Sequence, residues 1–157
     1  EADGAVGLSA RVLYYFNAGG VTPAMATSVA GEGSDYALAV LDSRKQAFDG
    51  GKTYRLRLPK DVPVKDFWAV TLYDTQTRSQ LQTSQKFPTV GSQSKGMTRN
   101  ADGSYDVFFG PKAPAGKAGN WLQTVPGKSW FTILRMYGPL EPWINKSWRP
   151  GEIELVE

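Results

Sequence analysis

Three neighbouring residues, Asn120, Trp121 and Gln123, combine a large aromatic ring with two side-chain amides. The face of an indole stacks on sugar or apolar rings, and amides hydrogen-bond at the edge of such a ligand. The segment therefore predicts a binding platform for a small molecule or a glycan. The same residues also suit a structural role, in which the ring plugs the end of a β-sandwich and the amides satisfy loop backbone groups.

Arg135 lies in the middle of the apolar segment 130–137. Burying a lone charge is unfavourable, so the guanidinium should have a partner. One interpretation is a buried ion pair, for which the sequence offers Asp66, Asp74 and Glu141. The other is that the guanidinium captures the carboxylate or sulfate group of a ligand.

A third set of polar residues, Tyr73, Asp74, Thr77 and Arg78, follows a predicted strand. Ligand sites often lie on loops at strand ends, so Tyr73 and Arg78 are candidate binding residues. Asp74 with Arg78 could act as a general acid or base beside an anion clamp. In the alternative interpretation Asp74 caps the following turn and Arg78 is solvated.

The composition excludes several kinds of chemistry, because the 157 residues contain no His and no Cys. Ser–His–acid and Cys–His nucleophiles, imidazole bases and His-based metal sites cannot be built from this chain alone. Asp102 and Asp106 flank a turn but lack the alternating oxygen ligands and terminal Glu of a calcium loop. We therefore expect no catalytic residues, no metal and no cofactor.

Length and charge point to a single globular domain. The chain has 157 residues, 41% of them hydrophobic, and a net charge of +3 from scattered Lys and Arg. A domain of this size supports its own core, and nucleic-acid binding would require clustered basic residues. No run of about 18 apolar residues is present, so we expect no membrane-spanning helix.

The residues that could do chemistry must be positioned by short strands. Apolar or alternating segments separated by Gly, Pro and Asp turns predict strands at 36–41, 53–58, 67–73, 105–109, 130–137 and 153–156. Segment 67–73 has bulky residues on both faces, which favours a central strand covered on both sides. Asn100–Ser104 carries an Asp-Gly pair, the strongest hairpin signal in the chain. We expect a mainly β fold, a jelly-roll-like antiparallel β-sandwich.

The N-terminal part differs from the rest. Leu8, Val12, Tyr15 and Phe16 have a helical spacing, and Gly19-Gly20 is a stop signal. We expect a short helix followed by a loop, with residues 1–32 packed on a sandwich formed by residues 33–157. All 157 residues then form one domain.

Several segments resemble one family. They occur in a fitting order, at 48–54, 62–68, 72–78, 100–104, 120–127, 137–143 and 148–151. Together they are similar to the C-terminal half of bacterial proteins of unknown function classed as DUF1254/DUF1214, here the DUF1214 domain. The resemblance implies a jelly-roll-like sandwich that follows an upstream Ig-like β domain, so we expect the chain to be part of a larger two-domain protein. It also favours a periplasmic or exported location, and it brings no catalytic residues.

Three functions remain open. The first is a non-catalytic ligand-binding or interaction module, supported by the aromatic residues and the absence of a nucleophile motif. The second is a hydrolase completed by the upstream domain, which would need two carboxyl groups in one cleft. The third is a structural domain that forms homo-oligomers.

Overall fold

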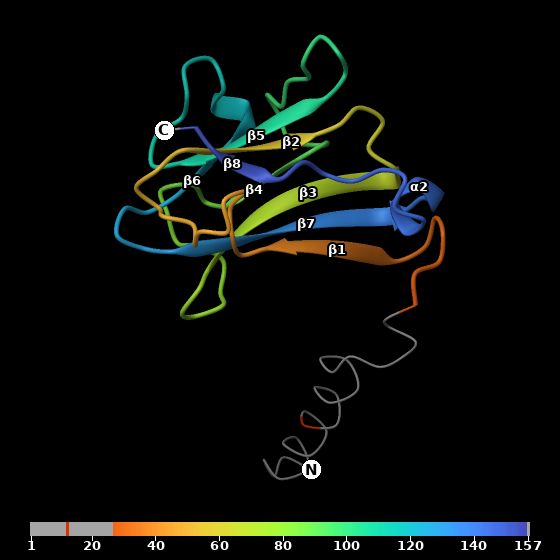
Figure 1. Cartoon of the computed structure of the whole chain (residues 1–157), viewed down its shortest axis with the longest axis horizontal. Helices are drawn as coiled ribbons and strands as arrows, with labels where there is room; N and C mark the ends of the chain where they lie inside the picture. The colour runs from red at the N-terminus through yellow and green to blue at the C-terminus, as the bar shows by residue number, and fades with distance from the viewer. Residues whose placement is uncertain (1–11, 13–26, 157) are drawn as a thin grey trace, which may run out of the picture.

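The computed structural model describes residue 12 and residues 27–156. The predicted N-terminal helix therefore lies outside the described residues, apart from position 12. The described part is mainly β, and its strands form two layers (Figure 1). No helix in this part is long and apolar enough to cross a membrane.

The first sheet has four strands, and their spatial order is β1 (Ser34–Ala39), β7 (Trp130–Pro139), β3 (Val64–Asp74) and β4 (Thr89–Gly91). The second sheet is ordered β6 (Trp121–Gln123), β5 (Tyr105–Gly110), β2 (Tyr54–Leu58) and β8 (Ile153–Leu155). Two short helices, η1 (Ala118–Asn120) and α2 (Glu141–Ile144), lie in the connections. The expected β-sandwich is thus confirmed at the level of a mainly β fold with two sheets, and the jelly-roll class stays a prediction.

The central ladder of the first sheet joins β3 to β7. It runs antiparallel from Phe67 opposite Tyr137 to Asp74 opposite Trp130, with a register shift between Val64 and Phe67. All other pairs of named strands are antiparallel too, except β5 with β6, which are parallel. A parallel pair needs a long crossover, and the Gly- and Pro-rich loop after β5 supplies it.

The core between the sheets is dominated by one aromatic cluster. The ring of Trp130 stacks on Phe48 with centroids 4.1 Å apart and on Phe109 at 4.9 Å. The ring of Tyr54 meets Trp130 edge-on at 5.6 Å. These four side chains come from both sheets and from the loop before β2, so the cluster ties the two layers together.

The six predicted strands are present, with boundaries shifted by one to three residues. The sequence prediction missed β4 and β6, which have only three residues each. The predicted hairpin at Asn100–Ser104 is wrong in part. The turn exists, with Gly103 at φ 84°, but β5 pairs with β2 and β6 and not with the segment before the turn.

A side-chain amide explains why that hairpin does not form. Asn120 accepts the backbone N–H of Thr98 at 2.8 Å and donates to the Thr98 carbonyl at 2.9 Å. These two bonds satisfy the groups of Thr98 that a neighbouring strand would otherwise bind. The segment before the turn is therefore held by a side chain and not by a β-ladder.

Candidate functional site

The face of the first sheet that points away from the core is unusually apolar. Side chains of β1, β7 and β3 alternate between the core and this second face, which we call the aromatic face. Its members in these three strands are Ser34, Tyr36, Leu38, Phe67, Ala69, Thr71, Tyr73, Phe131, Ile133, Arg135 and Tyr137. The solvent face of an antiparallel sheet is normally polar, so this composition calls for an explanation.

Exposure is greatest along the edge strand β1. Tyr36 is 59% exposed and Leu38 is 62% exposed, while Ala37 and Ala39 point to the inner side and line a gap between the sheets. The strand thus turns its large apolar residues outward and its small ones inward. The sequence prediction took 36–41 as an apolar run, although this alternation in size was a readable signal.

Two of the predicted binding residues meet on the aromatic face. The Nη2 atom of Arg135 donates a hydrogen bond of 2.8 Å to the hydroxyl of Tyr73. Tyr73 lies opposite Phe131, four residues along β7 from Arg135, so both long side chains lie along the sheet. The guanidinium carbon also lies 5.6 Å from the ring centroid of Tyr36, a cation–π contact.

The predicted ion pair of Arg135 is wrong. In residues 27–156 the guanidinium pairs with no carboxylate, and Asp74, one of the expected partners, pairs with Lys128. The reason is the face on which Arg135 lies, since its neighbours there are tyrosines. The hydroxyl of Tyr137 raises the pKa of Arg135, and the Nε atom is buried without a hydrogen-bond partner. The site therefore holds a permanent cation that has no carboxylate partner among residues 27–156.

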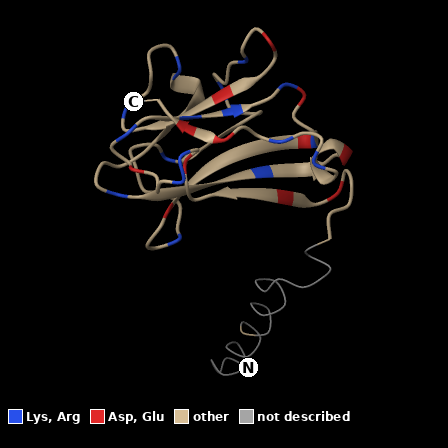
Figure 2. Cartoon of the chain, in the orientation of Figure 1, with Lys and Arg blue, Asp and Glu red and all other residues tan. Residues whose placement is uncertain are grey.

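Few charges surround this cation. Arg135 is the only charged residue in β7, and Asp35, the one charged residue of β1, accepts a hydrogen bond from the indole of Trp143. The charged residues of β3 lie towards its two ends, at Lys65, Asp66 and Asp74. Figure 2 shows the contrast between this sheet, with few charged positions, and the loops around it. The aromatic face is thus an apolar surface with a positive charge near its centre.

The predicted platform at Asn120, Trp121 and Gln123 lies in the second sheet. Asn120 is 2% exposed, and its amide also donates to the carbonyl of Asp106. The indole N–H of Trp121 donates to the carbonyl of Gly110. The side-chain amide oxygen of Gln123 accepts hydrogen bonds from the backbone N–H and the hydroxyl of Ser84. Ligand binding by these residues stays a prediction, and all three already serve as links between segments.

A glutamine that the sequence prediction left unassigned protects the edge of this sheet. The amide of Gln85 donates to the carbonyl of Trp121 and accepts the N–H of Gln123. It therefore occupies the free edge of β6, as a neighbouring strand would. Within residues 27–156, no hydrogen bond of this kind covers the free edge of β1.

Asp74 and Arg78 act locally. Asp74 caps its turn by accepting the N–H groups of Gln76 and Thr77, and its other oxygen lies 2.9 Å from Nζ of Lys128. Lys128 and then these backbone bonds lower the pKa of Asp74 to about 2. Arg78 is exposed and donates to the carbonyl of Thr75. The capping interpretation is confirmed for Asp74.

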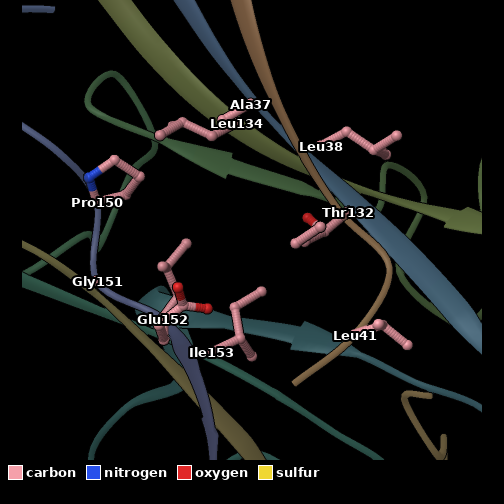
Figure 3. A pocket seen from close by; sticks show the side chains of 11 residues that line it. Ala37, Leu38, Leu41, Thr132, Leu134, Pro150, Gly151, Glu152 and Ile153 are labelled. Carbon is pink, nitrogen blue, oxygen red and sulfur yellow. The ribbon is translucent and has the colours of Figure 1, made fainter. Parts of the chain in front are cut away.

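A gap opens between the two sheets at β1 and β8. It measures about 170 Å³ and is mostly apolar, with Leu134 and Ile153 approaching from opposite sheets (Figure 3). Ligand sites usually measure roughly 300–1,000 Å³. The gap is too small for such a ligand, so the aromatic face is the stronger candidate.

We predict that Asn120→Asp lowers the free energy of unfolding by about 2–4 kcal/mol, measured by urea denaturation. The new oxygen would face the carbonyls of Thr98 and Asp106, which lose their donor. The matched control is Asn145→Asp, because the exposed amide of Asn145 is used only as an acceptor, for Ser147 N–H. An Asn120→Asp chain as stable as the control would contradict this role.

We also predict a pH dependence from Asp74. Its folded pKa, about 2, is below the usual value of 3.8. Its stabilising contribution is therefore complete above about pH 4 and is lost as the pH falls through about 2. Carboxyl NMR titration should show Lys128→Met raising the pKa of Asp74, whereas Lys112→Met should leave it unchanged. Titration of Asp74 near 3.8 in the parent chain would refute the assignment.

Comparison with solved structures gives the same fold. The VPA0106 protein from Vibrio parahaemolyticus aligns with a TM-score of 0.68 and 25% identity, over 79% of this chain and 31% of that chain. An uncharacterised protein from Burkholderia cenocepacia aligns at 0.51 and 14% identity, over 83% of this chain and 32% of that one. The chain thus covers about a third of each of these proteins.

No curated protein matches the chain. A family model, "Protein of unknown function (DUF1214)", matches residues 33–141, which include β1 to β7 and the whole aromatic face. The chain therefore belongs to the DUF1214 family.

Proposed function

We propose that this domain is a non-catalytic interaction module that binds another protein surface through the aromatic face. The observation that carries the proposal is the exposure of Tyr36 and Leu38 on a face whose other members are mostly apolar. Contiguous exposed apolar surfaces mark interaction sites in soluble proteins. Aromatic residues and Arg are also the residues enriched at the centres of protein interfaces.

Arg135 determines the charge that the partner surface needs. Covering its guanidinium with apolar groups alone would remove water from a charge that has no carboxylate partner among residues 27–156. A partner surface that places an Asp or Glu against Arg135 would offset this loss and fix the orientation of the complex. We therefore expect an apolar partner surface with one acidic residue near its centre.

The partner we propose is the upstream part of the same, longer polypeptide. The chain covers only 31% and 32% of the solved proteins that it resembles. The described residues lead from position 27 directly into β1, the exposed edge of the aromatic face (Figure 1). A tethered domain would be held close to this face at high effective concentration.

In this proposal the chain is the C-terminal DUF1214 half of a DUF1254/DUF1214 protein, and its partner is the Ig-like β domain. Residues 1–32 would pack on the sandwich as the connection between the two. The free edge of β1 supports a second candidate, a homo-oligomer in which β1 pairs with another copy, since uncovered edge strands pair readily.

We predict that Leu38→Asp has opposite effects in two contexts. In the 157-residue chain it should leave the melting temperature unchanged or raise it, because an exposed apolar side chain is lost. In the longer polypeptide it should weaken docking and separate the thermal unfolding into two transitions. Val156→Asp is the control, since Val156 is 42% exposed and follows β8 in the second sheet.

The same variants distinguish the two candidates. Light scattering that shows a dimer of the 157-residue chain, dissociated by Leu38→Asp alone, would favour the homo-oligomer. If Leu38→Asp and Val156→Asp behave alike in every context, the aromatic face is not an interaction surface.

A further inference from the structure

A second site, separate from the aromatic face, lies where the chain crosses from β7 to β8. We propose that a pocket there binds a ring compound that carries a carboxylate. The pocket, which we call the indole pocket, measures about 380 Å³ and is lined by Trp143, Lys146, Trp148, Arg149 and Pro150. This inference does not depend on the proposed docking partner.

Two indoles give the pocket its shape. The ring centroids of Trp143 and Trp148 are 6.2 Å apart, and their planes are tilted by 43°. Each ring is held at its N–H edge, Trp143 by the carboxylate of Asp35 and Trp148 by the carbonyl of Lys60. These bonds anchor the crossing. Trp143 is buried, so the ring available for stacking is that of Trp148, which is partly exposed.

Two cations line the same pocket. The Nζ atom of Lys146 lies 5.3 Å from the ring centroid of Trp143. Arg149 donates from Nε to the Lys146 carbonyl, and its other guanidinium N–H groups form no hydrogen bond with residues 27–156. Neither cation forms an ion pair with a carboxylate of residues 27–156, and no acidic residue lines the pocket. The local charge is therefore positive, which favours an anion.

Lys146 follows α2 with φ 66°, a left-handed conformation in which glycine is preferred at the end of a helix. Lys45, Asp61 and Arg78 also have positive φ, so this conformation by itself does not mark a site. The indole pocket is marked instead by its two rings and two cations.

The dimensions and chemistry limit the ligand. A volume of about 380 Å³ is near the lower end of ligand sites, which suits one ring of monosaccharide size. Indole faces stack on sugar and aromatic rings alike, and Lys with Arg binds a carboxylate. The expected ligand therefore contains a ring and a carboxylate. Both sugar acids and aromatic acids meet this description.

NMR titration of the indole N–H of Trp148 tests the proposal in the 157-residue chain. The probes are glucuronate and benzoate, each with a neutral counterpart, methyl glucoside and benzyl alcohol. We expect at least one acid to bind about tenfold more tightly than its counterpart. The acid that binds identifies the source of the ligand. If neither acid shifts the Trp148 signal at about 50 mM, the proposal is overturned.

Substitutions separate binding from folding. Lys146→Gly removes the cation and the backbone strain together, so the melting temperature should not fall while binding weakens about fivefold or more. Lys45→Gly is the matched control, because Lys45 has φ 62° and lies outside the pocket. It should bind the acid as the parent does. Arg149→Gln should also weaken binding, and unchanged binding in both pocket variants would overturn the proposal.

Discussion

The antiparallel ladder between β3 and β7 is the constraint on which the rest of the structure depends. Both strands carry large apolar side chains on both faces, so the ladder creates two apolar surfaces at once. One surface is buried against the second sheet through the Trp130 cluster. The other becomes the aromatic face. A sandwich of two sheets buries only one of these surfaces, and the second is left facing away from the core.

Side-chain amides hydrogen-bond to backbone groups that no neighbouring strand pairs with. Asn120 satisfies the backbone of Thr98, and Gln85 covers the free edge of β6. Such protection keeps edge strands from pairing with other chains. The edge of β1 has no comparable cover from residues 27–156, and it is also the strand with the most exposed apolar side chains. The unprotected edge and the unprotected face thus adjoin, and one partner could cover both.

The two proposed sites have different chemistry. The aromatic face combines a wide apolar surface with one cation, which suits a folded protein partner with a complementary acid. The indole pocket is small and lined by two cations, which suits a compact anion. The Trp143 indole bonds to Asp35 of β1, so the pocket is fixed to the edge of the aromatic face. A ligand in the pocket would therefore lie close to the docking edge.

Periodicity predicted the longer strands well. The alternation in 53–58 and the apolar segment 130–137 correspond to β2 and β7. The three-residue strands β4 and β6 were missed, because such short segments have no readable period. The Asp102–Gly103 turn was foreseen, but the competing bond from Asn120 to Thr98 depends on residues 22 positions apart.

The candidate sites were predictable only in part. Tyr73 and Arg135 were singled out separately, and only the β3–β7 register brings them together. The ion pair expected for Arg135 failed because a strand that is apolar on both faces does not reveal which face is the inner one. The indole pocket was not predicted, and Lys146 and Arg149 were missed. In segment 143–149 these two basic residues alternate with the two tryptophans, and this pattern could have indicated the pocket.

We propose that the upstream part of a longer polypeptide covers the aromatic face. Hydroxyl-radical labelling of Tyr36, with Val156 as the internal reference, measures this directly. Tyr36 is 59% exposed, and Val156, which follows β8 in the second sheet, is 42% exposed. Labelling of Tyr36 should fall strongly in the longer polypeptide relative to the 157-residue chain, while labelling of Val156 stays constant. Equal labelling of Tyr36 in both would contradict the proposal.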